Sequence, residues 1–186
     1  MGKKWLAIII FVLLFSSVYA DEIEGVFKDI CLSIKGQVNI PLEEQYRISQ
    51  GTSTDKNVQN KVGSLPSLSK EWQDELRALI KRDPNSIWSD DAQYIIANLY
   101  ALQNMPKQEA VELERLLTEY PNMHVEDWTR QTLSSIIPNA ADDLPVRTIL
   151  CTYYKQSGEI EKLKQLCNES IKKYPKNSKI FELMLN

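Results

Sequence analysis

The sequence predicts an all-α fold. Apolar residues recur every three or four positions through most of the chain, and no stretch shows the sustained alternation typical of a half-exposed strand. Three segments also end alike, with a proline closely followed by an asparagine, in LIKRDPNS, LLTEYPNM and SIKKYPKNS. Proline disfavours helical conformation in the residue before it, so Pro84, Pro121 and Pro175 are expected just beyond helix ends. These observations indicate antiparallel helical hairpins stacked along the chain.

The first twenty residues, MGKKWLAIIIFVLLFSSVYA, have the three parts of a secretory signal peptide. Lys3 and Lys4 form the basic start, an apolar block follows, and small residues precede Ala20. The block is shorter than the roughly 20 apolar residues of a spanning helix. We therefore predict a signal peptide over residues 1–20 and an exported protein, periplasmic or secreted. The alternative is an N-terminal membrane anchor that is not cleaved.

Charge and composition exclude several classes of function. Cleavage after Ala20 removes two of the 22 basic residues and none of the 25 acidic ones, so the net charge changes from −3 to −5. This charge argues against a nucleic-acid partner, which calls for a basic face. The mature length suits a single domain with a real core.

The sequence carries no recognisable catalytic, cofactor or metal motif. His124 is the single histidine, too few with three cysteines for a zinc pattern. No nucleophile elbow or phosphate-binding glycine loop occurs. The adjacent carboxylates at 43–44, 90–91 and 142–143 point apart on a helix, whereas a glycosidase pair faces across its substrate. We predict a protein that is not an enzyme and uses no cofactor or metal. An enzyme accessory subunit with an unrecognised site is an alternative.

The elements expected before residue 69 form two parts. Residues 21–48 are an N-terminal helical segment, in which Ile23, Phe27 and Ile34 share one helix face and Gly36 follows the end. Residues 49–68 are polar and rich in Ser, Thr, Asn and Gly, so we expect a flexible linker there.

Residues 69–186 are expected to form the helical domain. Ser69 is placed as the N-cap of its first helix, and acids at Asp90 and Asp91 suit the start of the second. The remaining helices follow in order at about residues 109–120, 124–137, 146–156, 159–174 and 178–185. The last of these is expected to cover the exposed end of the array.

The two clearest hairpins resemble the tetratricopeptide repeat, a helix pair of about 34 residues. The later hairpin matches five positions of the family pattern, which are the small residue Cys151, the aromatic Tyr154, the turn residue Gly158, the small residue Ser170 and the closing proline Pro175. The earlier hairpin matches three, which are the small residue Ala97, the aromatic Tyr100 and the closing proline Pro121. The earlier hairpin departs from the pattern at Glu109 and the later one at Leu163, where small residues are expected. An additional helix between the hairpins also interrupts the repeat.

The resemblance implies a concave groove, lined by the first helix of each hairpin, that holds a protein or peptide partner. The positions that correspond to it are Asp91, Tyr94, Asn98, Ala101, Leu102, Thr148, Thr152, Lys155 and Gln156. Asn98 matches an asparagine that some members use to grip a peptide. The lysine expected one turn earlier is replaced by Tyr94, which argues against a carboxylate clamp.

Cys151 and Cys167 lie on either side of a turn near residue 158, at similar height on two adjacent helices. A disulfide between them would staple the hairpin, provided that the Cα atoms lie within about 7 Å. The alternative is that both are small buried apolar residues. Cys31 is then the odd cysteine.

Together these features predict an exported scaffold or adaptor that binds other proteins, in a bacterial periplasm or cell envelope. The alternative is a membrane-tethered envelope assembly factor that retains residues 1–20.

Overall fold

The chain is described by a computed structural model. Its backbone is described for residues 2–38, 56–138 and 140–186, and its side chains for residues 20–38, 67–138 and 140–186. Within the described residues the secondary structure consists of eight α-helices and one short 3-10 helix, with no strand. The predicted all-α class is therefore confirmed.

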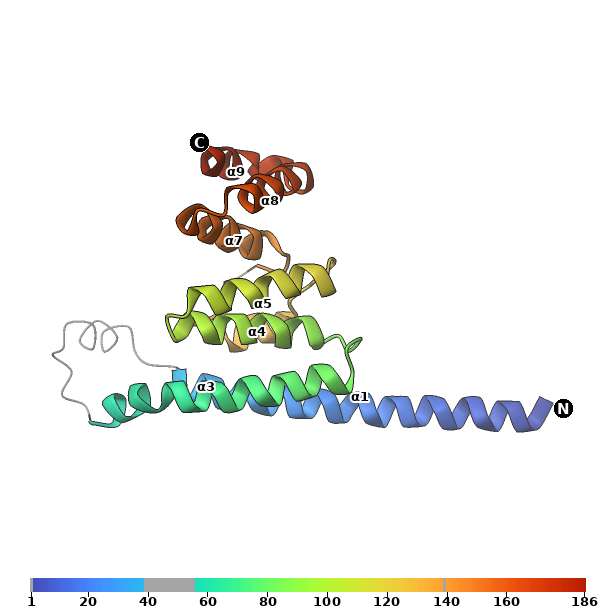
Figure 1. Ribbon diagram of the computed structural model, residues 1–186. Helices are drawn as coiled ribbons and strands as arrows, with labels where there is room; N and C mark the ends of the chain where they lie inside the picture. Colours follow the sequence, from blue (N-terminus) through green and yellow to red (C-terminus); the bar gives the residue numbers. More distant parts are fainter. Residues whose placement is uncertain (1, 39–55, 139) are drawn as a thin grey trace.

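The helices pack mainly against their neighbours in the sequence, which gives the layered arrangement in Figure 1. The elements, in order, are α1 (Gly2–Val38), α3 (Lys56–Arg82), α4 (Ser89–Leu102), α5 (Pro106–Glu119), α6 (Asp127–Thr132), α7 (Leu144–Ser157), α8 (Ile160–Lys173), η1 (Pro175–Asn177) and α9 (Ser178–Leu185). Contacts join α1 to α3, α4 to α5, and α7 to both α8 and α9. The short helix α6 contacts α1, so it bridges parts of the chain that are distant in sequence.

The helix ends follow the local chemistry of the sequence. The helices α3, α5 and α8 each end two residues before Pro84, Pro121 and Pro175, as predicted. Gly158 follows α7 with a positive φ of 77°, a conformation that glycine adopts without a steric penalty. The predicted final helix is confirmed, with α9 at the bounds expected.

The predicted linker over 49–68 is wrong for residues 56–68, which belong to α3; residues 39–55 lie outside the described residues. Ser69 is consequently not an N-cap but a fully buried residue inside the helix. The missed signal is a four-then-three spacing, which places Val58, Val62 and Leu65 in one row with Ser69, Trp72, Leu76 and Leu79. That row predicts one long helix despite its polar composition.

Two further helices differ from their predicted bounds. The helix α1 runs from Gly2 to Val38, so Gly36 lies in its last turn rather than beyond its end. The helix predicted near 124–137 is reduced to α6, and turns follow it. Leu133 and Ile137 are nevertheless buried, because these turns carry them into the core.

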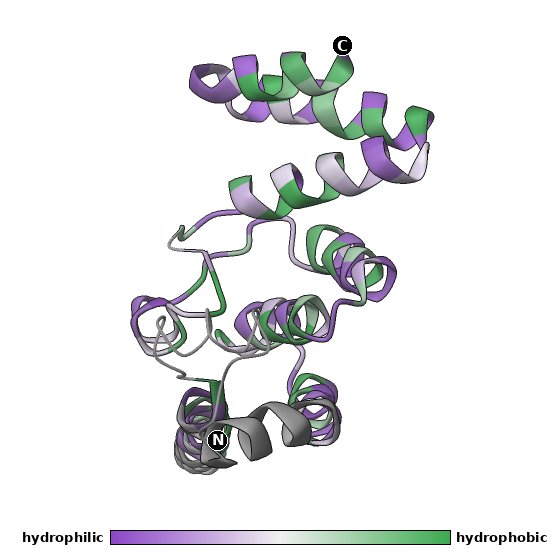
Figure 2. Ribbon diagram, turned by 90° about the vertical axis from the view of Figure 1, so that its left-hand side faces the viewer, coloured by the Kyte–Doolittle hydropathy of each residue, from purple (hydrophilic) through white to green (hydrophobic). Residues whose placement is uncertain are grey.

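The core is one contiguous cluster of apolar side chains from α1 to α9. Its centre is α4, in which every residue from 91 to 99 is buried, so this helix is covered on all sides. Figure 2 shows the helix pairs as successive layers, with polar and apolar residues on different sides of the helices. Among the residues that the structure describes, no helix is long and apolar enough to cross a membrane.

Candidate docking site

The structure closes the first half of the predicted groove. Asp91, Tyr94 and Asn98 are only 0%, 1% and 6% exposed, so they do not line an open surface. The expectation that these three residues face a partner is corrected by their burial. The two remaining positions on α4, Ala101 and Leu102, lie at its C-terminal end and are exposed, with Leu102 at 42%.

Residues 124–132, which lie between the two hairpins and which we call the α6 segment, cover the start of α4. The Asp91 carboxylate accepts hydrogen bonds from the Thr129 hydroxyl and from the backbone N–H of Glu126, the latter at 3.2 Å. The neighbouring Asp90 accepts one from the backbone N–H of His124 at 2.9 Å. Residues of the segment that interrupts the repeat therefore cover Asp91, one of the positions that the resemblance left open.

Asn98 is used within its own helix. Its side-chain amide donates to the backbone carbonyl of Tyr94 at 2.8 Å. Together with its burial, this bond leaves Asn98 unable to grip a peptide in this fold.

The second half of the predicted groove is open. Thr148, Thr152 and Gln156 line a pocket of about 230 Å³ between α5 and α7, which we call the α5–α7 pocket. Its other lining residues, which the sequence did not point to, are Pro106, Glu109, Ala110, Ile149 and Tyr153. Lys155 is not among them; its Nζ donates to the Leu183 carbonyl of α9 at 3.4 Å.

Glu109 gives the α5–α7 pocket its charge. It is the single charged residue among the described lining residues, and burial raises the pKa of its carboxyl group. Near it, the hydroxyl of Tyr94 is buried without a hydrogen-bond partner among the described residues. Burial raises the pKa of Tyr94, and the charge of Glu109 raises it further. The position at which Glu109 departs from the repeat pattern is thus part of the pocket wall.

A second pocket, of about 300 Å³, lies beside the loop that precedes α4. Asp90, Glu119, His124 and Glu126 line it, with Ile87 at 63% exposure. As in the α5–α7 pocket, none of the described lining residues is a lysine or arginine. Both pockets therefore suit a positively charged group better than an anion.

Asp91 is perturbed but enclosed. Burial raises its pKa to about 8, against the opposing hydrogen bond from Thr129. Its side chain has no exposed surface, and its oxygens are occupied by Thr129 and Glu126. A catalytic carboxyl group must reach a substrate, so this geometry assigns Asp91 to holding α4 against the α6 segment.

In Asp91→Asn, the free energy of unfolding is expected to fall less with rising pH than it does in the parent chain. The folded-state pKa of Asp91 is raised, so the stability it contributes is fully present below the unfolded value of 3.8 and is lost as pH rises through about 8. Urea unfolding of the parent chain from pH 6 to pH 9 should show this decline, and the variant should reduce it by roughly 1–3 kcal/mol. Asp127→Asn, an exposed change on α6, is the control and should leave the slope unchanged.

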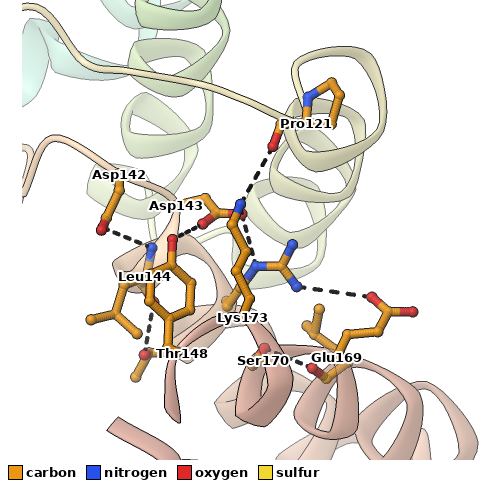
Figure 3. A network of polar contacts seen from close by, with 11 residues as sticks. Pro121, Asp142, Asp143, Leu144, Thr148, Glu169, Ser170 and Lys173 are labelled. Carbon is orange, nitrogen blue, oxygen red and sulfur yellow. Dashed lines mark hydrogen bonds and ion pairs between the residues drawn. The ribbon is translucent and has the colours of Figure 1, made fainter. Parts of the chain in front are cut away.

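A second polar network fixes α7 between α5 and α8 (Figure 3). Asp143, 1% exposed, accepts hydrogen bonds from Arg147 at 2.8 Å, from Lys173 at 2.9 Å and from the Tyr174 hydroxyl. Lys173 also donates to the carbonyl of Pro121 at 3.4 Å, just beyond α5. One buried carboxylate thus sets the position of the helix that forms one wall of the α5–α7 pocket.

The two candidate disulfide cysteines lie together. The sulfur atoms of Cys151 on α7 and Cys167 on α8 are 3.2 Å apart, both side chains are fully buried, and both are free thiols. The distance is longer than a disulfide bond of about 2.05 Å. The structure therefore places the pair in contact as thiols.

Comparison with protein-family models, with curated proteins and with solved structures found no match to this chain.

Proposed function

We propose that the chain is an exported docking protein without enzymatic activity, and that its α5–α7 pocket receives a basic side chain from a partner protein. The observation that carries this proposal is an open pocket with largely apolar walls and one half-buried acid, Glu109. A long cationic side chain matches both features, because its stem is apolar and its end is charged.

The walls of the pocket suit the two ends of such a side chain. Ile149 and Ala110 offer apolar contact to the methylene stem, and Glu109 offers a carboxylate to the cationic end. The Tyr153 ring adds a surface that attracts cations. Thr148, Thr152 and Gln156 supply hydroxyl and amide groups for a partner's backbone.

The packing of the hairpins supports a divergent array of the tetratricopeptide type. Ala97, Cys151 and Ser170, which stand at small-residue positions of that pattern, are each fully buried. The aromatic residue of the later hairpin, Tyr154, is also buried, and its hydroxyl donates to Glu114 of α5 at 2.7 Å. Small side chains let helices approach closely, and the stacked hairpins then leave a groove for a partner.

Features of α1 support cleavage after Ala20. Ile23 is the first buried residue of α1 among those whose side chains are described, and residues 20–22 are exposed. A chain starting at Asp21 places three acids, Asp21, Glu22 and Glu24, at the positive end of the shortened helix. Cleavage therefore leaves the described packing of α1 intact.

The continuity of α1 favours one alternative, a tethered form. This helix is unbroken from Gly2, and its first half extends beyond the helix pairs in Figure 1. N-terminal sequencing of the protein from its native compartment separates the two forms. A chain that begins at Asp21 supports the exported form, and one that retains residues 1–20 supports the tethered form.

Selection from a displayed peptide library should identify the chemistry of the partner. On the chain starting at Asp21, we expect enrichment of peptides with one recurrent Arg or Lys. Glu109→Gln should weaken their binding about five-fold in fluorescence anisotropy, since a partly exposed ion pair contributes up to about 1 kcal/mol. Replacing the recurrent Arg with uncharged citrulline should have a similar effect on the parent chain and little effect on Glu109→Gln.

Glu161→Gln is the matched control, since it makes the same charge change at an exposed position on α8. It should change the affinity by less than about two-fold. Equal losses from Glu109→Gln and Glu161→Gln would show general attraction by the acidic protein. Enrichment of peptides without a basic residue would contradict the proposal.

A further inference from the structure

The geometry of the last hairpin points to a covalent link that the thiol form does not yet contain. Cys151 and Cys167 face each other across the contact between α7 and α8, with their sulfur atoms 3.2 Å apart. They are 16 positions apart in the chain, and the turn at Gly158 brings their helices together. Both side chains are fully buried, so the sulfurs are held in contact by the packing around them.

We propose that Cys151 and Cys167 are oxidised to a disulfide in the mature protein, whereas Cys31 stays a thiol. Cys31 lies on α1, in a different layer of the molecule, where burial and then the charge of Asp91 raise its pKa. Because Cys151 and Cys167 lie in contact and pair with each other, Cys31 is left without a second cysteine of the chain to pair with. The location of the mature protein in an oxidising compartment rests on the export proposed above.

The oxidation transfers two electrons from the two cysteines to the oxidant, and the two thiol protons pass through solvent to the oxidant's two thiolates. One cysteine thiolate attacks the disulfide of the oxidant, a thiol–disulfide oxidoreductase or oxidised glutathione, and the oxidant releases one thiolate. The second cysteine thiolate then attacks the mixed disulfide, which forms the Cys151–Cys167 bond and releases the oxidant's second thiolate. The two cysteines are oxidised, and one disulfide of the oxidant is reduced to two thiols.

The bond is expected to form while the chain folds. In the folded protein burial raises the pKa of Cys151 and of Cys167, which lowers the fraction of reactive thiolate. During folding the turn at Gly158 brings the two cysteines together before the hairpin is covered. Once formed, the bond closes a short loop and restricts the unfolded chain.

The test is refolding of the reduced, denatured chain starting at Asp21 in a buffer of reduced and oxidised glutathione. Iodoacetamide is then added under denaturing conditions, and the intact mass is measured. We expect one alkyl group without reduction and three after it, with a linked peptide pair that contains Cys151 and Cys167. The thermal midpoint should fall by several degrees when reductant is added.

Variants make the assignment specific. Cys31→Ser should keep the linked peptides and take up no alkyl group before reduction. Cys151→Ser and Cys167→Ser should each take up two and lose the response of the midpoint to reductant. Uptake of three alkyl groups by the parent chain in the oxidising buffer, or a link that includes Cys31, would overturn the assignment.

A second experiment distinguishes failure of the Cys151–Cys167 pairing from failure of the proposed export, which supplies the oxidising compartment. The chain is produced in its native cells with residues 1–20 present at synthesis, and the protein that accumulates is isolated with its thiols blocked at lysis. A disulfide that forms in the glutathione buffer but is missing from the cells contradicts the exported location and leaves the geometric pairing intact. Failure in the buffer itself contradicts the pairing.

Discussion

Asp143→Ala is expected to lower the free energy of unfolding by about 3–5 kcal/mol, the cost of breaking a buried charge network by removing one partner. Asp143 is 1% exposed and accepts hydrogen bonds from Arg147, Lys173 and Tyr174. The variant leaves Arg147 and Lys173 without this carboxylate. Because these contacts join α7 to α8, and Lys173 also reaches Pro121, unfolding should become easier across the C-terminal half.

The same network predicts a dependence of stability on acid. Burial acts to raise the pKa of Asp143, but hydrogen bonds from Tyr174, Lys173 and Arg147 outweigh it and hold the pKa below its ordinary value of 3.8. For a lowered pKa, the stability is present above the unfolded value and is lost as pH falls through the folded value. The parent chain should therefore lose stability below about pH 4, and Asp143→Ala should lose less over that range.

Asp142→Ala is the control for this prediction. Asp142 is the exposed neighbour, and its carboxylate accepts one hydrogen bond from the backbone N–H of Leu144 at 3.2 Å. Its removal should cost about 1 kcal/mol or less. Urea unfolding monitored by circular dichroism at pH 7 measures both variants. Equal losses from the two would show that the Asp143 network does not stabilise the fold.

Phe27→Ala is expected to destabilise the protein by about 3–5 kcal/mol, the usual cost of removing a large buried aromatic side chain. Phe27 is fully buried on α1. The centroid of its ring lies 4.9 Å from the ring centroid of Trp88 and 6.4 Å from that of Trp128. These rings join α1, the loop before α4 and the α6 segment. The cavity should weaken the docking of α1 most of all, because its neighbours come from other layers.

Val26→Ala is the matched control, since it removes apolar atoms from the adjacent residue of α1 at 42% exposure. It should cost less than about 1 kcal/mol. Chemical unfolding followed by tryptophan fluorescence should report the larger loss for Phe27→Ala, because Trp88 and Trp128 lie beside the altered site. Faster hydrogen exchange in α1 should accompany this loss. Unchanged exchange in α1 would contradict the role assigned to Phe27.

The sequence predicted the helices well wherever a local rule operates. The prolines at 84, 121 and 175 lie two residues beyond helix ends because their effect on the preceding residue is local. The apolar periods likewise predicted which faces of α7 and α8 are buried, through Val146, Leu150, Leu163 and Leu166. The early start of α3 could also be predicted from its four-then-three spacing, in which Ser69 is the one polar member. The proline rule does not mark an end at Pro66, which lies inside this helix.

The candidate site was predicted only in part, because exposure depends on what covers a helix. Asp91 and Asn98 occupy positions that the repeat pattern leaves open, yet the α6 segment covers the start of α4 and Asn98 bonds within its own helix. Thr148, Thr152 and Gln156 line the pocket as expected, and α5 supplies Glu109 opposite them. Nothing local to Glu109 indicates that it lines the same pocket as Thr152.

By itself the sequence determined the helical class, the helix ends at the prolines and the apolar faces that must be buried, since each follows from neighbours a few residues apart. Only the tertiary structure decided that α4 is enclosed, that Asp143 joins α7 to α8 and that the α5–α7 pocket is open. Those outcomes depend on side chains distant in sequence, and the packing of whole helices determines which of them meet.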